Sequence, residues 1–193
     1  VIEEEYPSVP VSLSSEVAPV IREYERTSTV AINAYVVPVV EEYLEFLRDE
    51  LRSEGFGGEV YLMTSSGGIV DIATAKAEPV RLVESGPAAG VLASRIFGQK
   101  QDAADVFSFD MGGTTAKGSI IRDGDIRMKY QTDVARVHRF KEGSGYDITT
   151  PLLDLTEIGA GGGSIASIND VGLVEVGPES AGSDPGPVCY NQG

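Results

Sequence analysis

Two apolar runs separated by a polar, glycine-containing turn form the clearest pattern in this chain. The runs are residues 106–109 and 118–122, and residues 110–115 lie between them. Aromatic and β-branched residues on both sides of such a turn are typical of a β-hairpin. A second turn signal at residues 122–125 leads into Ile126, so the pattern predicts an antiparallel meander of three strands. With the helices expected upstream, this favours an α/β fold with a mixed sheet.

A helical repeat precedes this region, between residues 27 and 53. Pro38 lies inside the repeat, and because proline has no backbone N–H we expect it to kink or restart the helix. Glycines from Gly55 onward are expected to end it. The apolar face predicted by the spacing consists of Val36, Val40, Tyr43, Leu47 and Leu51.

Strand and helix signals alternate in the remaining N-terminal part. Residues 59–64 are predicted to form a buried strand that ends in a Ser-Ser-Gly-Gly loop, and residues 69–76 a short helix. The loop is either a ligand-binding loop or a plain turn. Ser85 and Pro87 mark the start of an Ala-rich helix. Residues 1–13 are acidic and proline-punctuated, and we expect a connector there, with the domain covering residues 14–193.

The turn between the first two strands carries the residues with the clearest chemistry. Gly112 and Gly113 leave room for a ligand to approach the main chain, and successive backbone N–H groups can converge on an anion. Thr114 and Thr115 add hydroxyl donors, and Asp110 is placed to orient a hydrated divalent cation. The turn therefore predicts a phosphate loop on a hairpin. The alternative is an ordinary hairpin with a glycine-rich bend.

A second glycine-rich segment lies at residues 159–163, between two apolar stretches. Gly161, Gly162 and Gly163 cost backbone entropy on folding, so we expect a backbone contact with a phosphate or with a neighbouring strand. Asp154 and Glu157 lie close by in sequence. They are either metal-associated groups or ordinary acidic residues of a loop. His138 is the only histidine and lies in the only basic patch. A lone histidine is more often structural than a ligand.

Composition narrows the function classes. The 193 residues include 30 acidic and 15 basic side chains, for a formal net charge of −15, which argues against nucleic-acid partners and against attraction to anionic membranes. Cys189 is the only cysteine, which fits a reducing compartment and a cytoplasmic location. The chain begins at Val1 without a methionine and ends in a loop-like segment, so we expect a fragment of a longer polypeptide.

Four sequence strings carry a resemblance to a known family. They are FDMGGTT at residues 109–115, ESGPAAGV at 84–91, IGAGGGSIA at 158–166 and VGPESAGSDPGPVCY at 176–190. In this order and spacing they resemble the hydantoinase A/5-oxoprolinase family, which includes N-methylhydantoinase A and subunits of acetone and acetophenone carboxylases. The likeness runs from about residue 14 to the end of the chain.

The resemblance implies an actin-like ATPase (ribonuclease H-like) fold, of which this chain would be one lobe or a central fragment. In that fold two α/β lobes each supply a phosphate hairpin around ATP and Mg²⁺ or Mn²⁺. Residues 110–115 would be the second-lobe hairpin, and the first-lobe hairpin is absent from these residues. The family phosphorylates an amide or carbonyl oxygen, so the implied substrate is a cyclic amide or a ketone. The implied partner is a hydantoinase B-like subunit or domain.

One departure from the family's sequence pattern bears on the expected metal site and on the choice between the hydrolase and carboxylase branches of the family. Many hydantoinase and oxoprolinase sequences have a histidine shortly after the position of Asp154, where this chain has Thr156 and Glu157. The leading hypothesis is a fragment of an ATP-dependent cyclic-amide hydrolase. The alternatives are the nucleotide-binding subunit of an acetone-carboxylase-like ligase and a non-catalytic domain with the actin-like fold.

Overall fold

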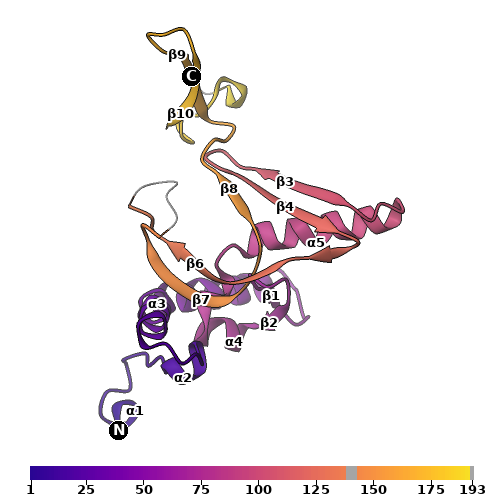
Figure 1. The fold of residues 1–193 in the computed structure, drawn as a ribbon. Coiled ribbons are helices and arrows are strands. Elements are labelled where there is room, and N and C mark those ends of the chain that lie inside the picture. The colour runs from indigo at the N-terminus through magenta and orange to yellow at the C-terminus, as the bar shows by residue number, and fades with distance from the viewer. Residues whose placement is uncertain (138–142, 192–193) are drawn as a thin grey trace. The chain divides into compact units, whose positions relative to one another are not determined.

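The computed structural model describes residues 1–137 and 143–191, and the chain forms two compact units (Figure 1). Unit 1 combines Val1–Ala89 with Met128–Leu153, and unit 2 combines Gly90–Arg127 with Asp154–Gly193. Each unit contains helices and strands, which confirms the mixed α/β class. The expected mixed sheet is wrong, because every strand pair among the described residues is antiparallel. Each unit is also built from two separate stretches of the chain.

Unit 1 is organised around its longest helix and two antiparallel strand pairs. Strand β1 pairs with β2, and β6 pairs with β7. The buried residues Val17, Val80 and Ile148 come from three parts of the sequence and form one core cluster. The elements are α1 (Ile2–Glu5), α2 (Ser14–Val17), α3 (Glu23–Ser53), β1 (Tyr61–Met63), β2 (Ile69–Asp71), α4 (Ile72–Ala77), the 3₁₀ helix η1 (Pro79–Leu82), β6 (Met128–Val134) and β7 (Tyr146–Leu153).

Several predictions for the short elements of unit 1 need correction. The strand expected to be buried at residues 59–64 is the three-residue β1, and its Tyr61 is 57% exposed. Residues 1–13 contain the one-turn helix α1, so the connector is not wholly extended. The segment predicted as a helix at residues 69–76 begins instead as strand β2, because residues 69–71 pair with β1 across the Ser-Ser-Gly-Gly loop. Helix α4 starts only after Asp71, whose carboxylate accepts a hydrogen bond from the backbone N–H of Thr74 at 2.7 Å. This bond caps the first turn of the helix.

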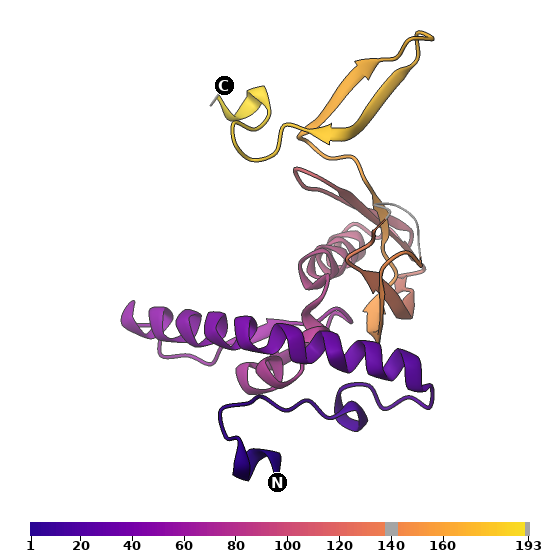
Figure 2. The same cartoon turned by 90° about the vertical axis from the view of Figure 1, so that its left-hand side faces the viewer.

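Helix α3 is longer than the sequence suggests. It starts at Glu23 and continues past Pro38 without interruption, so the expected restart at this proline is wrong (Figure 2 shows α3 from the side). It ends at Ser53, and Gly55 follows with a φ of +86°, as the glycine signal predicted. The buried side is also displaced from the predicted stripe, since Tyr43 is 58% exposed. Its buried residues are Thr29, Asn33, Val37 and Leu44.

Two of these buried side chains are polar and hydrogen-bonded to distant backbone. Asn33 donates from Nδ2 to the carbonyl oxygen of Ala77 at 2.9 Å and to Ser12 Oγ at 3.1 Å, and its Oδ1 accepts from the N–H of Val80 at 3.2 Å. Thr29 Oγ1 accepts from the N–H of Thr149 at 2.9 Å. Buried polar groups stabilise a fold only when they are paired, so these bonds fix how α3 packs on η1 and β7.

Replacing Asn33 with alanine should destabilise unit 1 by about 3 kcal/mol, because buried backbone groups lose their partner. These groups are the carbonyl of Ala77 and the N–H of Val80. The matched control is Tyr35→Ala on the same helix, where the side chain is 84% exposed. The control should change the free energy of unfolding by less than about 0.5 kcal/mol. Urea unfolding of both variants measures the difference, and equal midpoints would show that the Asn33 bonds add nothing to stability.

Unit 2 is a four-stranded antiparallel sheet with one helix and a separate hairpin. In the sheet β3 lies on one side of β4, while β5 and β8 share the other side at its opposite ends (Figure 1). Strands β9 and β10 pair only with each other among the described strands. The elements are the part of α5 (Ser85–Lys100) from Gly90 onward, β3 (Val106–Met111), β4 (Ala116–Arg122), β5 (Asp125–Ile126), β8 (Thr156–Ile158), β9 (Ser164–Ile168), β10 (Val174–Ser180) and the 3₁₀ helix η2 (Val188–Tyr190).

Helix α5 packs on one face of this sheet. Ser94 Oγ on the helix donates to Ser108 Oγ on β3 at 3.0 Å. Gly98 lies so close to Val106 that an added Cβ would come within 2.4 Å of a Val106 methyl group. Ile121, directly opposite Val106 on β4, is only 1% exposed. The sheet face that carries Val106, Ser108 and Ile121 is therefore covered by α5.

Candidate functional site

The predicted hairpin is present, and its two strands are antiparallel as expected. Strands β3 and β4 are antiparallel, and Phe109 lies opposite Gly118. The strands extend further toward the turn than expected, because Asp110 pairs with Lys117 and Met111 with Ala116. Asp110 is therefore the second-last residue of β3, and only residues 112–115 form the turn.

The turn presents backbone donors that nothing in the described chain uses. The N–H of Gly112 donates across the turn to the carbonyl oxygen of Thr115 at 2.9 Å. The next three N–H groups, of Gly113, Thr114 and Thr115, have no acceptor among the described residues. A Cβ built on Gly113 would meet nothing within 4 Å, so open space adjoins these donors. Consecutive unpaired N–H groups beside open space are a suitable site for an anion.

Asp110 is exposed at the base of this turn. Its carboxylate has no hydrogen bond or ion pair with any described residue. Across the sheet it lies opposite Lys117, which in turn lies opposite Glu157 of β8. Residues that are directly opposite in an antiparallel sheet share a face, so a row of alternating charge crosses the three strands next to the turn.

The second glycine segment lies against the first turn. The N–H groups of Gly162 and Gly163 donate to the carbonyl oxygens of Gly112 and Gly113, at 2.9 and 2.7 Å. The N–H of Gly161 donates to Ser164 Oγ at 2.9 Å. A Cβ on Gly161 would lie 2.6 Å from the Gly112 oxygen and 2.7 Å from the Gly113 carbonyl carbon, so only glycine fits. The segment was predicted to contact a phosphate or a neighbouring strand, and the structure shows a backbone contact with the turn that joins β3 and β4 instead. Phosphate contact by Gly161, Gly162 and Gly163 stays a prediction.

The structure does not bring Asp154 to the turn. Its carbonyl oxygen accepts from Ser119 Oγ at 2.9 Å, while Asp110 lies nearer the turn, opposite Lys117. Within the described residues no group of three or more histidine, cysteine or acidic side chains is arranged to hold a metal ion. A metal role for Asp154 therefore has no geometric support here. His138 lies outside the described residues.

The Ser-Ser-Gly-Gly loop is the hairpin turn between β1 and β2. Ser65 is buried, and its single O–H is shared between the carbonyl oxygens of Arg81, at 2.7 Å, and of Val83. Thr64 and Ser66 share a hydrogen bond of 2.9 Å between their hydroxyl groups. The loop hydroxyls are thus used to hold the loop together, which favours the plain turn.

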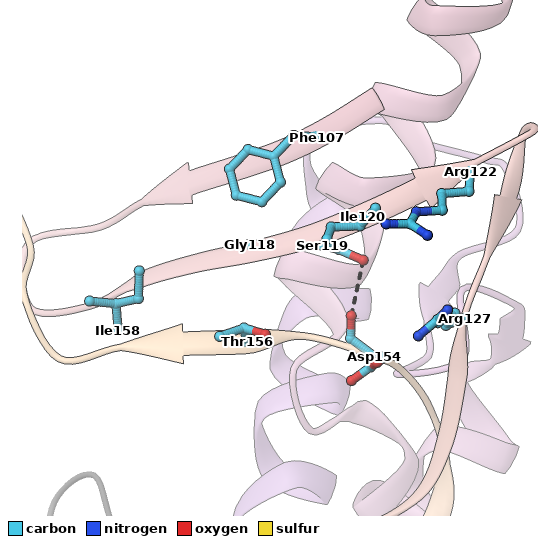
Figure 3. Close-up of a pocket in the computed structure, with 9 residues that line it drawn as sticks. All are labelled: Phe107, Gly118, Ser119, Ile120, Arg122, Arg127, Asp154, Thr156 and Ile158. Atoms are coloured by element: carbon cyan, nitrogen blue, oxygen red, sulfur yellow. Dashed lines mark hydrogen bonds between the residues drawn. The ribbon is translucent and has the colours of Figure 1, made fainter. Parts of the chain in front are cut away.

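A pocket that the sequence analysis missed lies on the sheet of unit 2. It encloses about 240 Å³, and Figure 3 shows Arg122, Arg127 and Asp154 at one end of it. The rest of the lining is Phe107, Gly118, Ser119, Ile120, Thr156 and Ile158. The alternation of Phe107, Phe109 and Met111 in the sequence indicates an apolar face on β3, but only Phe107 of these three lines the pocket.

Comparison with known proteins gives relatives over almost the whole chain. A family model described as hydantoinase/oxoprolinase matches residues 26–193. An uncharacterized protein of Methanocaldococcus jannaschii is 47% identical over 189 residues, covering 96% of this chain and 28% of that protein. The acetophenone carboxylase gamma subunit of Aromatoleum aromaticum is 34% identical, covering 100% of this chain and 26% of that subunit.

A solved structure agrees with these relatives. Caprolactamase subunit alpha of Pseudomonas jessenii is 36% identical, covering 97% of this chain and 26% of that subunit. The crystal structure of the ATP-dependent caprolactamase from the same organism superposes with a TM-score of 0.74, at 32% identity, over 99% of this chain and 27% of that one.

The chain spans about a quarter of the length of these relatives. No helix in the described part of the chain has the length and apolar character needed to cross a membrane. The family model covers most of the sequence and includes both glycine segments described above. The chain belongs to the hydantoinase/oxoprolinase family.

Proposed function

We propose that the β3–β4 hairpin binds the phosphates of ATP in an ATP-dependent enzyme that hydrolyses cyclic amide bonds. The observation that carries the proposal is the turn at residues 112–115. It offers consecutive unpaired N–H groups, two threonine hydroxyls and open space at Gly113. One relative is by name an ATP-dependent caprolactamase, and a lactam is a cyclic amide. The proposal includes the actin-like ATPase fold, with this chain as a part of one lobe.

The residues of the hairpin fit a nucleotide and its metal. The three free N–H groups would hold phosphate oxygens, and the hydroxyls of Thr114 and Thr115 would add donors. The unpaired carboxylate of Asp110 would hold a hydrated Mg²⁺ or Mn²⁺ through its water ligands. When bound, ATP would supply the phosphoryl group that activates the amide oxygen. With a net charge of −15, the protein must hold the phosphates through such local donors and a metal.

The Gly161–Gly163 segment would hold the turn in place without itself contacting the phosphates. Its hydrogen bonds to the carbonyl oxygens of Gly112 and Gly113 orient the peptide units of the turn. Preorganised donors bind an anion without a cost for reorientation. A hydantoinase B-like partner subunit or domain and a cytoplasmic location remain parts of the proposal that rest on the family resemblance and on composition.

A second candidate is the nucleotide-binding subunit of a ligase that carboxylates ketones. It is favoured by the acetophenone carboxylase gamma subunit at 34% identity. It is also favoured by Thr156 and Glu157 in β8, where many hydrolases of the family have a histidine. The turn at residues 112–115 would serve the same role in both reactions.

The two candidates are separated by assaying the full-length natural polypeptide, with its partner, in the presence of ATP and Mg²⁺. Caprolactam, 5-oxoproline and hydantoin are compared with acetone or acetophenone plus bicarbonate, and both ADP and the organic product are measured. ADP release coupled to ring opening is expected. Coupling to ketone carboxylation instead would select the second candidate, and nucleotide binding without turnover on any substrate would favour a non-catalytic domain.

Residues 1–193 alone should not turn over ATP. Phosphoryl transfer depends on positioning and charge stabilisation around the whole phosphate chain, and the proposal supplies one hairpin of the two. Phosphate release by the pure 193-residue chain should equal that of its Asp110→Ala variant. Steady turnover that Asp110→Ala abolishes would contradict the one-lobe assignment.

A further inference from the structure

The separate hairpin of β9 and β10 (Figure 2) has one apolar face. Val174 lies opposite Ile168 and Val176 lies opposite Ala166, so these four side chains share a face of the two strands. The short loop between the strands adds two apolar residues at the tip of the hairpin. We call this surface the hairpin patch, and it consists of Ile168, Val171, Leu173, Val174 and Val176, each between 55% and 78% exposed.

The hairpin is fixed at its base and open along the hairpin patch. At the base, the N–H of Gly163 donates to the carbonyl oxygen of Gly113, and the carbonyl oxygen of Gly163 accepts from the N–H of Ala181, both at 2.7 Å. Beyond the base, β9 and β10 pair only with each other among the described strands. A two-stranded hairpin alone is at best marginally stable in water. A contiguous exposed apolar patch therefore marks a surface that another surface covers.

The segment that carries the hairpin patch has only negative charges. Within unit 2, Gly90–Arg127 has five basic and five acidic residues, whereas Asp154–Gly193 has six acidic residues and no basic one. Asp170 precedes Val171 at the tip of the hairpin, and Glu179 lies near its base on β10. Both acidic side chains are exposed. The hairpin patch therefore lies between acids at its two ends.

The basic residues of the neighbouring sheet do not offset this charge. Lys117, on the strand that follows the turn, lies between Asp110 and Glu157 in the cross-strand register. Arg122 lies opposite Asp125 at the other end of the same strand. Directly opposite residues of an antiparallel sheet are close enough to interact, so these basic residues are matched by acids of the sheet itself.

We propose that the hairpin patch docks the partner subunit of the proposed function, through an apolar surface of that subunit that is rimmed by lysine or arginine side chains. Positive charge on the partner complements the acids at both ends of the patch. A second copy of this chain is a poor match, because it would set the same acidic segment against itself. The inference rests on the proposed function for the existence of the partner, and it does not depend on nucleotide binding.

Thiol labelling in the absence of nucleotide tests the docking. In a Cys189→Ser background of the full-length natural polypeptide, Ile168→Cys and Val176→Cys place a thiol on each strand of the hairpin patch, so that one poorly folding variant does not decide the outcome. Ser167→Cys is the matched control, because Ser167 is exposed on the opposite face of β9. The maleimide labelling rate is measured with and without the purified partner subunit.

In the polypeptide alone all three thiols should react at similar rates. With saturating partner subunit, the two patch thiols should react on the order of 100-fold more slowly, because reaction then requires local opening, and the Ser167→Cys control should stay fast. Unchanged rates at both patch positions would overturn the proposal. So would slow labelling in the polypeptide alone, and a dilution series would then show whether a second copy or the polypeptide itself provides the cover.

Charge reversal tests the basic rim of the partner. Asp170→Lys with Glu179→Lys should raise the dissociation constant for the partner subunit about tenfold, mainly through slower association. Glu42→Lys with Glu50→Lys makes the same change in net charge at exposed positions of α3, and should leave the dissociation constant within about twofold. Equal dissociation constants for the two pairs would show that no basic rim faces the hairpin patch. Because nucleotide is absent from every measurement, docking and ATP-dependent turnover can fail independently.

Discussion

Replacing Asp110 with asparagine should lower ATP-dependent turnover of the full-length enzyme by on the order of 100- to 1000-fold, the usual effect of losing one well-placed electrostatic contact. Asparagine keeps the shape of the side chain but removes the charge that would hold the hydrated metal. Because the Asp110 carboxylate is exposed and has no partner among the described residues, the fold should be unaffected. A higher Mg²⁺ concentration should restore part of the lost activity.

Turnover, nucleotide affinity and the thermal midpoint are measured for Asp110→Asn and for Asp125→Asn. Asp125 is another exposed acid, on β5 of the same sheet, and serves as the control. Its activity is expected to stay within about twofold of the unmodified enzyme, because it lies at the other end of the sheet from the turn. Near-normal turnover by a folded Asp110→Asn enzyme would mean that the turn is only structural, and the phosphate-loop proposal would have to be abandoned.

Replacing Gly161 with valine should destabilise unit 2 by about 2 kcal/mol, the usual effect of forcing extra atoms into a packed site, and should weaken nucleotide binding as well. The new side chain would meet the carbonyl groups of Gly112 and Gly113 at distances of 2.6 Å and 2.7 Å. Backbone atoms cannot move aside as a flexible side chain can, so the turn must shift, and its free N–H groups with it. Urea unfolding and nucleotide titration measure the two effects.

Gly113→Val is the matched comparison, because it alters the same turn from the open side. A Cβ there meets nothing within 4 Å, and Gly113 has no left-handed φ. The free energy of unfolding should therefore change by less than about 0.5 kcal/mol. Nucleotide affinity should still fall, since the side chain would occupy the space beside the free N–H groups. If Gly161→Val matches the unmodified protein in both measurements, the segment does not support the turn.

The hairpin could be predicted from the sequence because every signal in it is local. Apolar alternation, paired glycines and a second turn within a few residues all point to the same antiparallel meander. The strand ends were less well determined. Asp110 pairs with Lys117 and belongs to β3, because the ladder continues as long as a partner is present on β4.

The packing of α3 could not be predicted because long-range contacts decide it. An apolar repeat indicates a face, but Thr29 and Asn33 are buried through partners on β7 and η1 that are distant in sequence. Likewise the role of Gly161 depends on the position of the Gly112 and Gly113 carbonyl groups. Glycine enrichment indicated a close approach of some kind, and two interpretations fitted it equally well.

The exposure of Phe107 and Phe109 on β3 was not predicted, for a related reason. Alternating apolar residues in β3 predict a buried face, which is the ordinary situation in a sheet. Only the structure shows that α5 covers the other face, where Ser94 donates to Ser108. Because α5 packs on the opposite face, Phe107 and Phe109 lie on the face that α5 does not cover, and they are exposed.

The discontinuous make-up of unit 1 has a consequence for its synthesis. Thr29 Oγ1 and Ser28 Oγ on α3 bond to the backbone of Thr149 and Asp147, so the helix acquires these partners only after residues up to 149 have been made. On the ribosome, Gly90–Arg127 emerges before unit 1 can close, and α3 must wait with its apolar side exposed. A chain cut anywhere before Met128 lacks strands β6 and β7. Binding of chaperones is therefore expected mainly while residues 90–149 are being synthesised. Because both units are discontinuous, a simple C-terminal truncation cannot isolate either of them.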